Sequence, residues 1–346
     1  MVIGETARVN AMASRAPQTG SDIARGATAP LRGPYIGRFA PSPTGPLHFG
    51  SLVAAVASYA DARAANGRWL LRIEDVDTPR CTQAAEVEIL RQLRAFGFEA
   101  DSEIIRQSER SERYDLALKQ LRAAGHLFAC TCTRKLLKFA PRNDCGESIY
   151  PGRCRALAQV ESATTALRLR VPLASDAVIA FADRALGALA QNITTEVGDF
   201  ILRRADRLYA YQLAVVVDDA SQCVTDVVRG EDLLMNTPRQ IYLQRRLGVA
   251  TPRYLHVPLV KTEAGEKLSK QTRATAIEID NAVSTLKAAW RFLGQRDVAD
   301  VASVAQFWQR AIPSWDPALT RPDAGGLNWP NIADIANTVA KSIIES

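Results

Sequence analysis

The chain contains no stretch of 18 or more consecutive apolar residues among its 346, which excludes a hydrophobic membrane-spanning helix. The first 33 residues also lack the apolar segment of a secretory signal. They carry Glu5 and Asp22 and show no amphipathic stripe, which argues against an organelle transit peptide. We therefore expect residues 1–33 to form a disordered leader on a cytoplasmic protein that has no membrane partner.

Cysteine is too scarce for a disulfide scaffold, because six cysteines are spread over a chain of this length. Four of them nevertheless fall within residues 130–154, where Pro and Gly are frequent and hydrophobic periodicity is weak. A segment that cannot build its own core is a natural place for a structural metal ion. The alternative is a reduced, metal-free loop. The four cysteines are Cys130, Cys132, Cys145 and Cys154.

Neither charge nor composition is extreme. The hydrophobic fraction of 47% and the charged fraction of 23% are typical of a globular protein. The net charge of +6 permits a polyanionic partner without requiring one. The length is sufficient for two domains or for one large domain with an insertion.

Strand-like and helix-like segments alternate after the leader. This order is typical of a doubly wound α/β sheet, in which ligands bind at the carboxyl ends of the strands. We therefore expect Arg38 and Glu74, near the ends of two strands, to lie by the same crevice. The predicted strands are 35–40, 68–73 and 104–105, and the predicted helices are 47–66, 82–96 and 109–125.

Residues 130–195 interrupt the alternation, and we interpret them as an insertion between two halves of the nucleotide-binding fold. From Asp199 we expect the alternation to resume. The predicted domains are 34–129 and 196–275 for the two halves, 130–195 for the insertion, and 276–346 for C-terminal helices and a tail. Further strands are predicted at 167–172, 178–181, 200–204, 223–229 and 256–260, and further helices at 237–247, 277–295 and 299–312.

The segment from Arg38 to Ser51 indicates a nucleotide-phosphate site. Its Pro-Ser-Pro-Thr-Gly-Pro run cannot continue a strand or a helix and therefore forms a turn. A strand, a tight turn and a helix start leave backbone N–H groups facing an anion. In the first turn of that helix, the His48 imidazole can contact phosphate. The missing Cβ of Gly50 lets adenine lie against the backbone.

A second phosphate element lies far along the chain, where Lys267 and Lys270 flank a hydroxyl in a charged, Gly-containing loop. Together with His48-Phe49-Gly50-Ser51, the segment Lys267-Leu268-Ser269-Lys270-Gln271 resembles the HIGH and KMSKS signatures of class I aminoacyl-tRNA synthetases. The lead-in 38–45 and the segment 72–75 resemble the glutamyl branch of that class. The alternative is a Pro-rich turn and a basic surface loop without a ligand.

The resemblance implies a Rossmann-like class I catalytic domain with an inserted zinc-containing subdomain and C-terminal helices. It also implies that ATP with Mg²⁺ activates an amino acid by in-line attack on the α-phosphate, for which the protein supplies position and positive charge. The implied catalytic residues are His48, Lys267 and Lys270. The implied ATP-binding residues are His48, Gly50, Ser51 and Lys270.

A glutamate site must bind two carboxylates and an ammonium group. Arg38 and Arg229 are the candidate carboxylate partners, because a guanidinium pairs with carboxylate in a bidentate manner. Glu74 is the candidate for the ammonium, and Tyr211 can add a hydroxyl. Read without the family, each of these could be a surface charge or a capped strand end. By resemblance, the glutamate-binding residues are Arg38, Phe39, Ala40, Pro41, Ser42, Glu74, Tyr211 and Arg229.

The cysteine segment resembles the zinc site of the glutamyl-queuosine tRNA(Asp) synthetases, a small family of this branch. Its Cys-x-Cys and Tyr-x-x-x-Cys pattern maps onto Cys130, Cys132, Tyr150 and Cys154, which implies one structural zinc ion. A metal can supply the pKa shift that a phenolate ligand needs. Cys145 departs from the family pattern and either replaces Tyr150 or stays free.

The chain has 76 residues after Lys270, which leaves no room for the helical anticodon-binding region of a full glutamyl-tRNA synthetase. The resemblance therefore implies an enzyme that activates L-glutamate and attaches it to the queuosine base in the anticodon loop of tRNA(Asp). We expect a monomer. The alternatives are a truncated glutamyl-tRNA synthetase that charges a tRNA 3′ end, and a catalytically silent RNA-binding paralogue.

Overall fold

The computed structural model describes residues 33–143, 146–157, 160–173, 177–260 and 276–320. Within these ranges, the helices are too short or too polar to cross a membrane.

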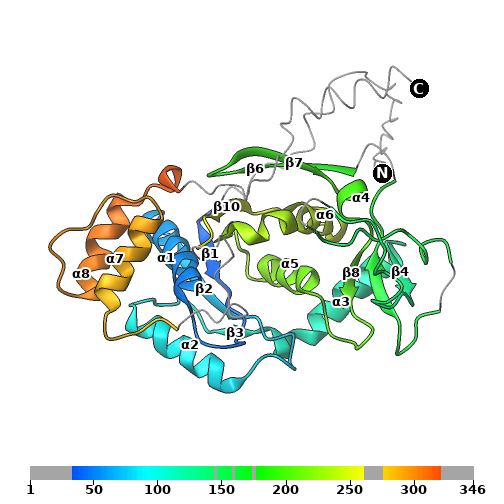
Figure 1. Cartoon of the computed structure of the whole chain (residues 1–346), viewed down its shortest axis with the longest axis horizontal. Helices are drawn as coiled ribbons and strands as arrows, with labels where there is room; N and C mark the ends of the chain where they lie inside the picture. Colours follow the sequence, from blue (N-terminus) through cyan, green and yellow to red (C-terminus); the bar gives the residue numbers. More distant parts are fainter. Residues whose placement is uncertain (1–32, 144–145, 158–159, 174–176, 261–275, 321–346) are drawn as a thin grey trace, which may run out of the picture.

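The first half of the nucleotide-binding fold is a parallel sheet with the strand order β1-β2-β3, which confirms the predicted alternation. Helix α1 lies against β1 and β2 (Figure 1). It can approach the sheet closely because its buried face consists largely of alanines and other small residues. The elements are β1 (Ile36–Phe39), α1 (Phe49–Ala64), β2 (Arg68–Ile73), α2 (Gln83–Ala95), β3 (Ile105–Arg106) and α3 (Ser111–Ala123).

The second half is a sheet with the order β7-β6-β10-β9, in which β10 runs parallel to β9 and β6. Strands β1 and β9 are neighbours, because the backbone N–H of Thr225, just before β9, donates to the carbonyl of Ile36 at 2.9 Å. The strand order of the sheet therefore reverses between β1 and β9, and doubly wound folds bind ligands at such a point. The elements are β6 (Val178–Asp183), β7 (Gly187–Asn192), α5 (Tyr211–Ser221), β9 (Asp226–Gly230), α6 (Thr237–Leu247) and β10 (Arg253–Val257).

A separate antiparallel sheet with the order β4-β5-β8 stands at one end of the molecule (Figure 1). It corrects one expectation, because the strand predicted at 200–204 does not resume the parallel alternation: β8 (Phe200–Arg203) pairs with β5 (Ala166–Leu169). Conversely, the strand predicted at 178–181 is β6, which joins the nucleotide sheet. Strand pairing thus crosses the predicted limits of the insertion, residues 130 and 195. These limits remain a prediction. Strand β4 spans Leu127–Cys130.

The helices α7 and α8 form the opposite end of the molecule (Figure 1). They are shorter than predicted, with α7 at Ala282–Phe292 and α8 at Val304–Ala311. The remaining short helices are α4 (Ile193–Glu196), η2 (Gln107–Arg110), η4 (Glu231–Asn236), η6 (Ile312–Ser314) and η7 (Pro317–Leu319).

A buried carboxylate connects three parts of this core. Asp61, in α1, accepts hydrogen bonds from the hydroxyl of Tyr35 and from the indole N–H of Trp315, the latter at 2.8 Å. It also accepts hydrogen bonds from both terminal nitrogens of Arg184, at 2.5 and 2.8 Å. Arg184 follows β6 and Trp315 follows α8, so one side chain ties both regions to α1.

Candidate active site and metal site

A cavity of about 610 Å³ opens at the carboxyl ends of β1, β2, β9 and β10, beside the start of α1. Its position is the one expected for a ligand site in a doubly wound fold. The cavity gathers every predicted site residue of the catalytic fold that the structure describes. These are Arg38, Phe39, Ala40, Pro41, Ser42, His48, Gly50, Ser51, Glu74, Tyr211 and Arg229.

His48 caps the N-terminus of α1, one position before the helix itself begins. Its Nδ1 accepts the backbone N–H of Ser51 at 3.2 Å. An accepting Nδ1 places the proton of the neutral ring on Nε2. The ring is therefore arranged as a hydrogen-bond donor at a helix N-terminus, which suits an anionic phosphate.

Lys267 and Lys270 lie outside the described residues, but both flanks of their segment are described. On one side, Val260 lines the cavity. On the other side, Ala276 forms an antiparallel bridge with His48, and the N–H of Ile277 donates to the carbonyl of Leu47 at 3.0 Å. The described residues on the two sides of the lysines thus lie at the cavity and beside His48.

Arg38 and Glu74 belong to a buried charge network built around Asp219 of α5. Asp219 accepts from Nε of Arg38 at 3.1 Å and from Nη2 of Arg72 at 2.7 Å. The same nitrogen of Arg72 lies 3.4 Å from Glu74. Burial alone would raise the pKa of Asp219, but Arg38 and Arg72 outweigh it and lower that pKa. Burial raises the pKa of Glu74, and the two arginines only partly oppose this.

Arg229 is held by a different set of partners, all of them uncharged. Its Nε donates to Nε2 of His256 at 3.2 Å. Nδ1 of His256 in turn lies 2.7 Å from Asp183, so the ring donates there and accepts from Arg229. Burial lowers the pKa of His256, which keeps the ring neutral. The other hydrogen bonds of Arg229 go to Gln240, Thr237, Tyr211 and the carbonyl of Leu233.

The sequence-based prediction missed the residues that hold these arginines. Arg72 carries a usable signal, because it is a charge inside the otherwise apolar segment Trp69–Ile73. Asp219 carries a weaker one, because it follows the apolar run Leu213–Val217 together with Asp218. A charge in such a run is either paired or functional. His256 and Asp183 carry no comparable signal, since 73 residues separate them in the chain.

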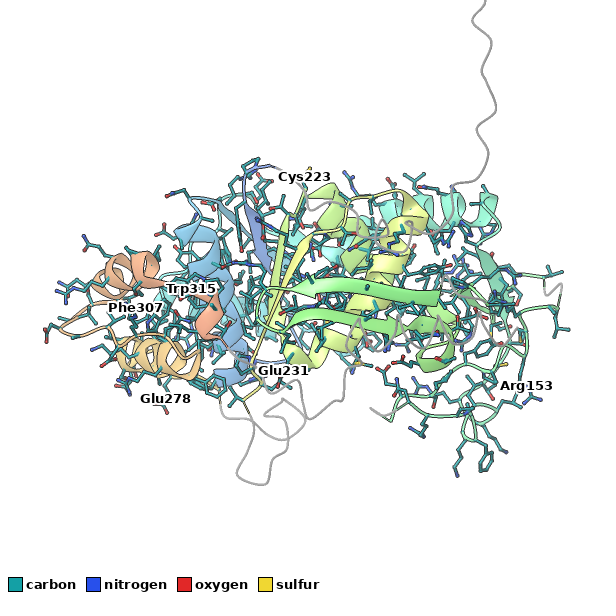
Figure 2. The ribbon with its side chains drawn as sticks, turned by 90° about the horizontal axis from the view of Figure 1, so that it is seen from above. Arg153, Cys223, Glu231, Glu278, Phe307 and Trp315 are labelled. Carbon is teal, nitrogen blue, oxygen red and sulfur yellow. The ribbon has the colours of Figure 1, made fainter. Side chains whose placement is uncertain are left out.

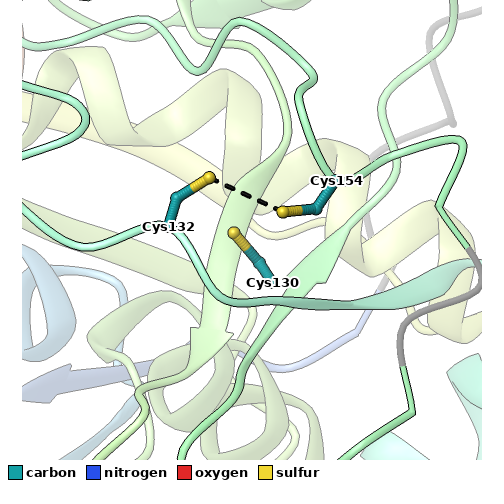
Figure 3. A group of neighbouring side chains, drawn as sticks. All are labelled: Cys130, Cys132 and Cys154. Carbon is teal, nitrogen blue, oxygen red and sulfur yellow. Dashed lines mark hydrogen bonds between the residues drawn. The ribbon is translucent and has the colours of Figure 1, made fainter.

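Three cysteine thiols converge next to the antiparallel sheet (Figure 3). The Sγ atoms of Cys130, Cys132 and Cys154 all lie within 4.8 Å of one another, and those of Cys132 and Cys154 are 3.5 Å apart. The phenolic oxygen of Tyr150 lies 3.4 Å from Sγ of Cys130 and 3.8 Å from Sγ of Cys132. The structure therefore brings together all four predicted ligands, whereas Cys145 lies outside the described residues.

These distances fit a tetrahedral zinc ion. Bonds of about 2.3 Å to sulfur and about 2.0 Å to oxygen give edges of about 3.8 Å between two sulfurs and about 3.5 Å between sulfur and oxygen. The backbone N–H of Cys154 donates to the Tyr150 oxygen at 2.9 Å, as it would to a phenolate. Burial opposes ionisation of Cys154, but hydrogen bonds from Thr131, Tyr150 and Cys132 lower its pKa to about 6. Burial raises the pKa of Tyr150, so this ligand would need the metal to ionise.

Comparison with known proteins places this chain in a family. The family model described as "tRNA synthetases class I (E and Q), catalytic domain" matches residues 36–290. A protein of Thiobacillus denitrificans named Glutamyl-Q tRNA(Asp) synthetase is 56% identical over 270 residues, covering 78% of this chain and 89% of the relative. A protein of the same name from Pseudomonas fluorescens is 51% identical over 294 residues, covering 84% and 95%.

A solved structure supports the fold independently. The glutamate–tRNA synthetase of Elizabethkingia anophelis superposes with a TM-score of 0.69 at 23% identity, over 90% of this chain and 71% of that chain. The chain therefore belongs to the class I tRNA synthetases for E and Q and, within them, to the family of glutamyl-Q tRNA(Asp) synthetases, which makes it a ligase of the glutamate–tRNA type.

Proposed function

We propose that the protein converts L-glutamate and ATP to glutamyl-adenylate and then transfers the glutamate to queuosine in the anticodon loop of tRNA(Asp). The observation that carries the first step is the single cavity beside the α1 N-terminus, which gathers His48 with Arg38, Glu74, Tyr211 and Arg229. One compartment thus offers donors for phosphate and partners for an amino acid.

In the activation step, a carboxylate oxygen of glutamate attacks the α-phosphorus of ATP. The bond to the β-phosphate oxygen breaks, and pyrophosphate leaves with the electron pair. The donor face of His48 and the N-terminus of α1 stabilise charge on the phosphates. Lys267 and Lys270 act on the leaving pyrophosphate, together with the Mg²⁺ that the nucleotide brings. The protein supplies no nucleophile to this step.

The amino acid is oriented by charges of opposite kinds. Glu74 pairs with the glutamate ammonium. The hydroxyl of Tyr211 donates to a carboxylate, and Nη1 of Arg229 gives up its long contact with Tyr211, at 3.5 Å, to donate to the same carboxylate. Arg38 has a single hydrogen bond among the described residues, through Nε, so both terminal nitrogens remain for a second carboxylate. The segment Phe39–Ser42 forms the wall between these groups.

The transfer step rests on the relatives. Proteins named Glutamyl-Q tRNA(Asp) synthetase match this chain at 50–56% identity over most of their own length. A hydroxyl of the queuosine cyclopentene diol would attack the carbonyl carbon of the adenylate. AMP then leaves and the hydroxyl proton is released. The zinc ion, held by Cys130, Cys132, Tyr150 and Cys154, would have a structural role.

Two assays test the two steps. Glutamate-dependent exchange of pyrophosphate into ATP by the purified protein alone tests activation, because every group proposed for that step belongs to the protein. Transfer of labelled glutamate to tRNA(Asp) with and without queuosine tests the acceptor. We expect transfer only to the modified tRNA, and none to tRNA(Glu).

Removal of the 3′-terminal adenosine separates the acceptor from its alternative. Trimmed tRNA(Asp) that contains queuosine should still accept glutamate. Loss of acceptance on trimming would instead favour a truncated glutamyl-tRNA synthetase that charges the 3′ end. Absence of exchange would favour the catalytically silent RNA-binding alternative.

A further inference from the structure

The segment that carries the metal site also presents an unusual surface, which we call the knuckle surface. It consists of exposed side chains between the first and last cysteines of the site. Figure 2 shows one of them, Arg153, at the end of the molecule opposite Phe307 of α8. The surface comprises Arg134, Lys135, Lys138, Phe139, Arg142 and Arg153.

Positive charge is concentrated in the segment that carries this surface. Residues 130–155 contain six Lys or Arg against two Asp or Glu, a net charge of +4, although the whole chain carries only +6. Arg134, Lys135 and Arg153 form no ion pair with any described residue, and Arg142 donates to the backbone carbonyl of Gly146. Unpaired exposed cations attract a polyanion such as an RNA backbone.

In the sequence Phe139 lies between Lys138 and Arg142, and its side chain is 89% exposed, more than any other large hydrophobic side chain among the described residues. The ammonium of Lys138 lies 5.8 Å from the centre of its ring. An exposed aromatic ring between cations is the arrangement that binds single-stranded nucleic acid, because the ring stacks on a base while the cations contact phosphates. A duplex stem does not offer an unstacked base to such a ring.

The segment that carries the knuckle surface contacts other parts of the fold, and these contacts fix the position of the surface. The amide of Asn143 donates to the carbonyl of Glu196 at 3.1 Å, and Glu147 pairs with Arg239 of α6. Gly198 has a φ of +70°, and a Cβ there would lie 2.7 Å from the carbonyl oxygen of Tyr150. The backbone around the metal site therefore packs directly on the segment that precedes β8.

We propose that the knuckle surface binds the unpaired nucleotides of the acceptor RNA loop, with the ring of Phe139 stacked on one base and the surrounding cations on the flanking phosphates. This inference rests on the proposed function, since the RNA loop is the one that carries the glutamate acceptor. It adds a contact outside the catalytic cavity, and binding at this surface does not require glutamate activation.

Fluorescence anisotropy with a labelled anticodon stem-loop of tRNA(Asp) tests this contact. Phe139→Ala should raise the Kd about tenfold, the loss expected for one stacked base. Phe139→Trp should bind as tightly as the unchanged protein. Leu116→Ala is the matched control, because Leu116 is 62% exposed on α3 and is not part of the knuckle surface. The double variant Lys135→Ala, Lys138→Ala should reduce the slope of log Kd against log salt by about 0.7 per lysine.

Each variant is also assayed for glutamate-dependent pyrophosphate exchange, which should stay unchanged. A Phe139→Ala protein that binds the stem-loop with the original Kd overturns the proposal. So does equal competition by the stem duplex without its loop, because phosphate contacts alone would then account for binding. If binding depends on Phe139 but no glutamate is transferred, the proposed acceptor is refuted and the proposed RNA contact of the knuckle surface stands.

Discussion

Two arginines of the cavity are held in opposite electrostatic settings. Arg38 shares the carboxylate of Asp219 with Arg72, so the protein itself compensates part of its charge. Arg229 donates only to neutral acceptors. One of them is His256, whose tautomer is fixed by the hydrogen bond to Asp183. The direction of the Arg229 guanidinium therefore depends on the tautomer of a histidine that does not line the cavity.

Asp183→Asn should raise the KM for glutamate about tenfold in pyrophosphate exchange and change kcat much less, as for a lost hydrogen bond to a charged group. One Asp183 oxygen accepts the N–H groups of Ala185 and Leu186, and the other accepts two N–H groups of His256. An asparagine has one oxygen. If its NH₂ group faces Nδ1 of His256, then Nδ1 must accept and the ring proton moves to Nε2. There it would point at the Nε–H group of Arg229, and that hydrogen bond would be lost.

The control is Asp206→Asn, an exposed residue paired with Arg204 on a turn, which should leave the KM unchanged. A folded Asp183→Asn protein with the original KM for glutamate would show that His256 does not position Arg229.

The acid limb of the pH profile should report Glu74. Burial raises the pKa of this carboxyl, so the proton returns at a higher pH than for an ordinary glutamate, whose pKa is about 4.3. Protonation removes the partner of the substrate ammonium. We therefore expect kcat/KM for glutamate in pyrophosphate exchange to fall as the pH drops, with a midpoint above that ordinary value. Glu74→Gln should show weak activity without this limb, and a limb that persists in it would belong to another group.

Among the elements, those defined by local pattern were predicted well. Strand β2 and helix α6 have the predicted bounds, because an apolar run between turns and an amphipathic run before Gly248 specify them locally. Strand β8 was assigned to the wrong sheet, since four residues with the sequence Phe-Ile-Leu-Arg suit a parallel or an antiparallel neighbour equally. The cavity residues within 38–51 were predictable as one motif, whereas the network around Asp219 forms only when distant elements pack.

The segment around the cysteines has a small core of its own, and its four ligand side chains should carry its stability. Cys132→Ser should reduce bound zinc from about one ion per chain to a small fraction, measured by metal analysis, and lower the Tm. Cys223→Ser is the control, because Cys223 is exposed and lies outside the cluster.

Two more variants identify the fourth ligand. Tyr150→Phe should release zinc, and Cys145→Ala should retain it. The reverse result would assign the fourth position to Cys145 and remove Tyr150 from the site.

On the scale of the whole molecule, Asp61 connects α1 to the turn after β6 and to the segment after α8. Asp61→Ala should lower the free energy of unfolding by about 3 kcal/mol, because it removes the buried carboxylate that Tyr35, Arg184 and Trp315 share. Urea unfolding measures this loss. Asp297→Ala breaks an exposed ion pair with Arg291 and should leave the unfolding midpoint unchanged. Equal midpoints for the two variants would mean that Asp61 does not hold these regions together.

The charge of Arg229 has a consequence for the stability of the ligand-free enzyme. Arg229 is 5% exposed and forms no ion pair with the described residues, so the empty fold carries the desolvation cost of a guanidinium without a counter-ion. A bound carboxylate removes that cost and thereby couples substrate occupancy to folding. L-Glutamate should therefore raise the Tm in thermal denaturation more than L-glutamine, which has nearly the same shape without the charge. In Arg229→Gln this difference should vanish, and the substrate would no longer act as the missing half of a buried ion pair.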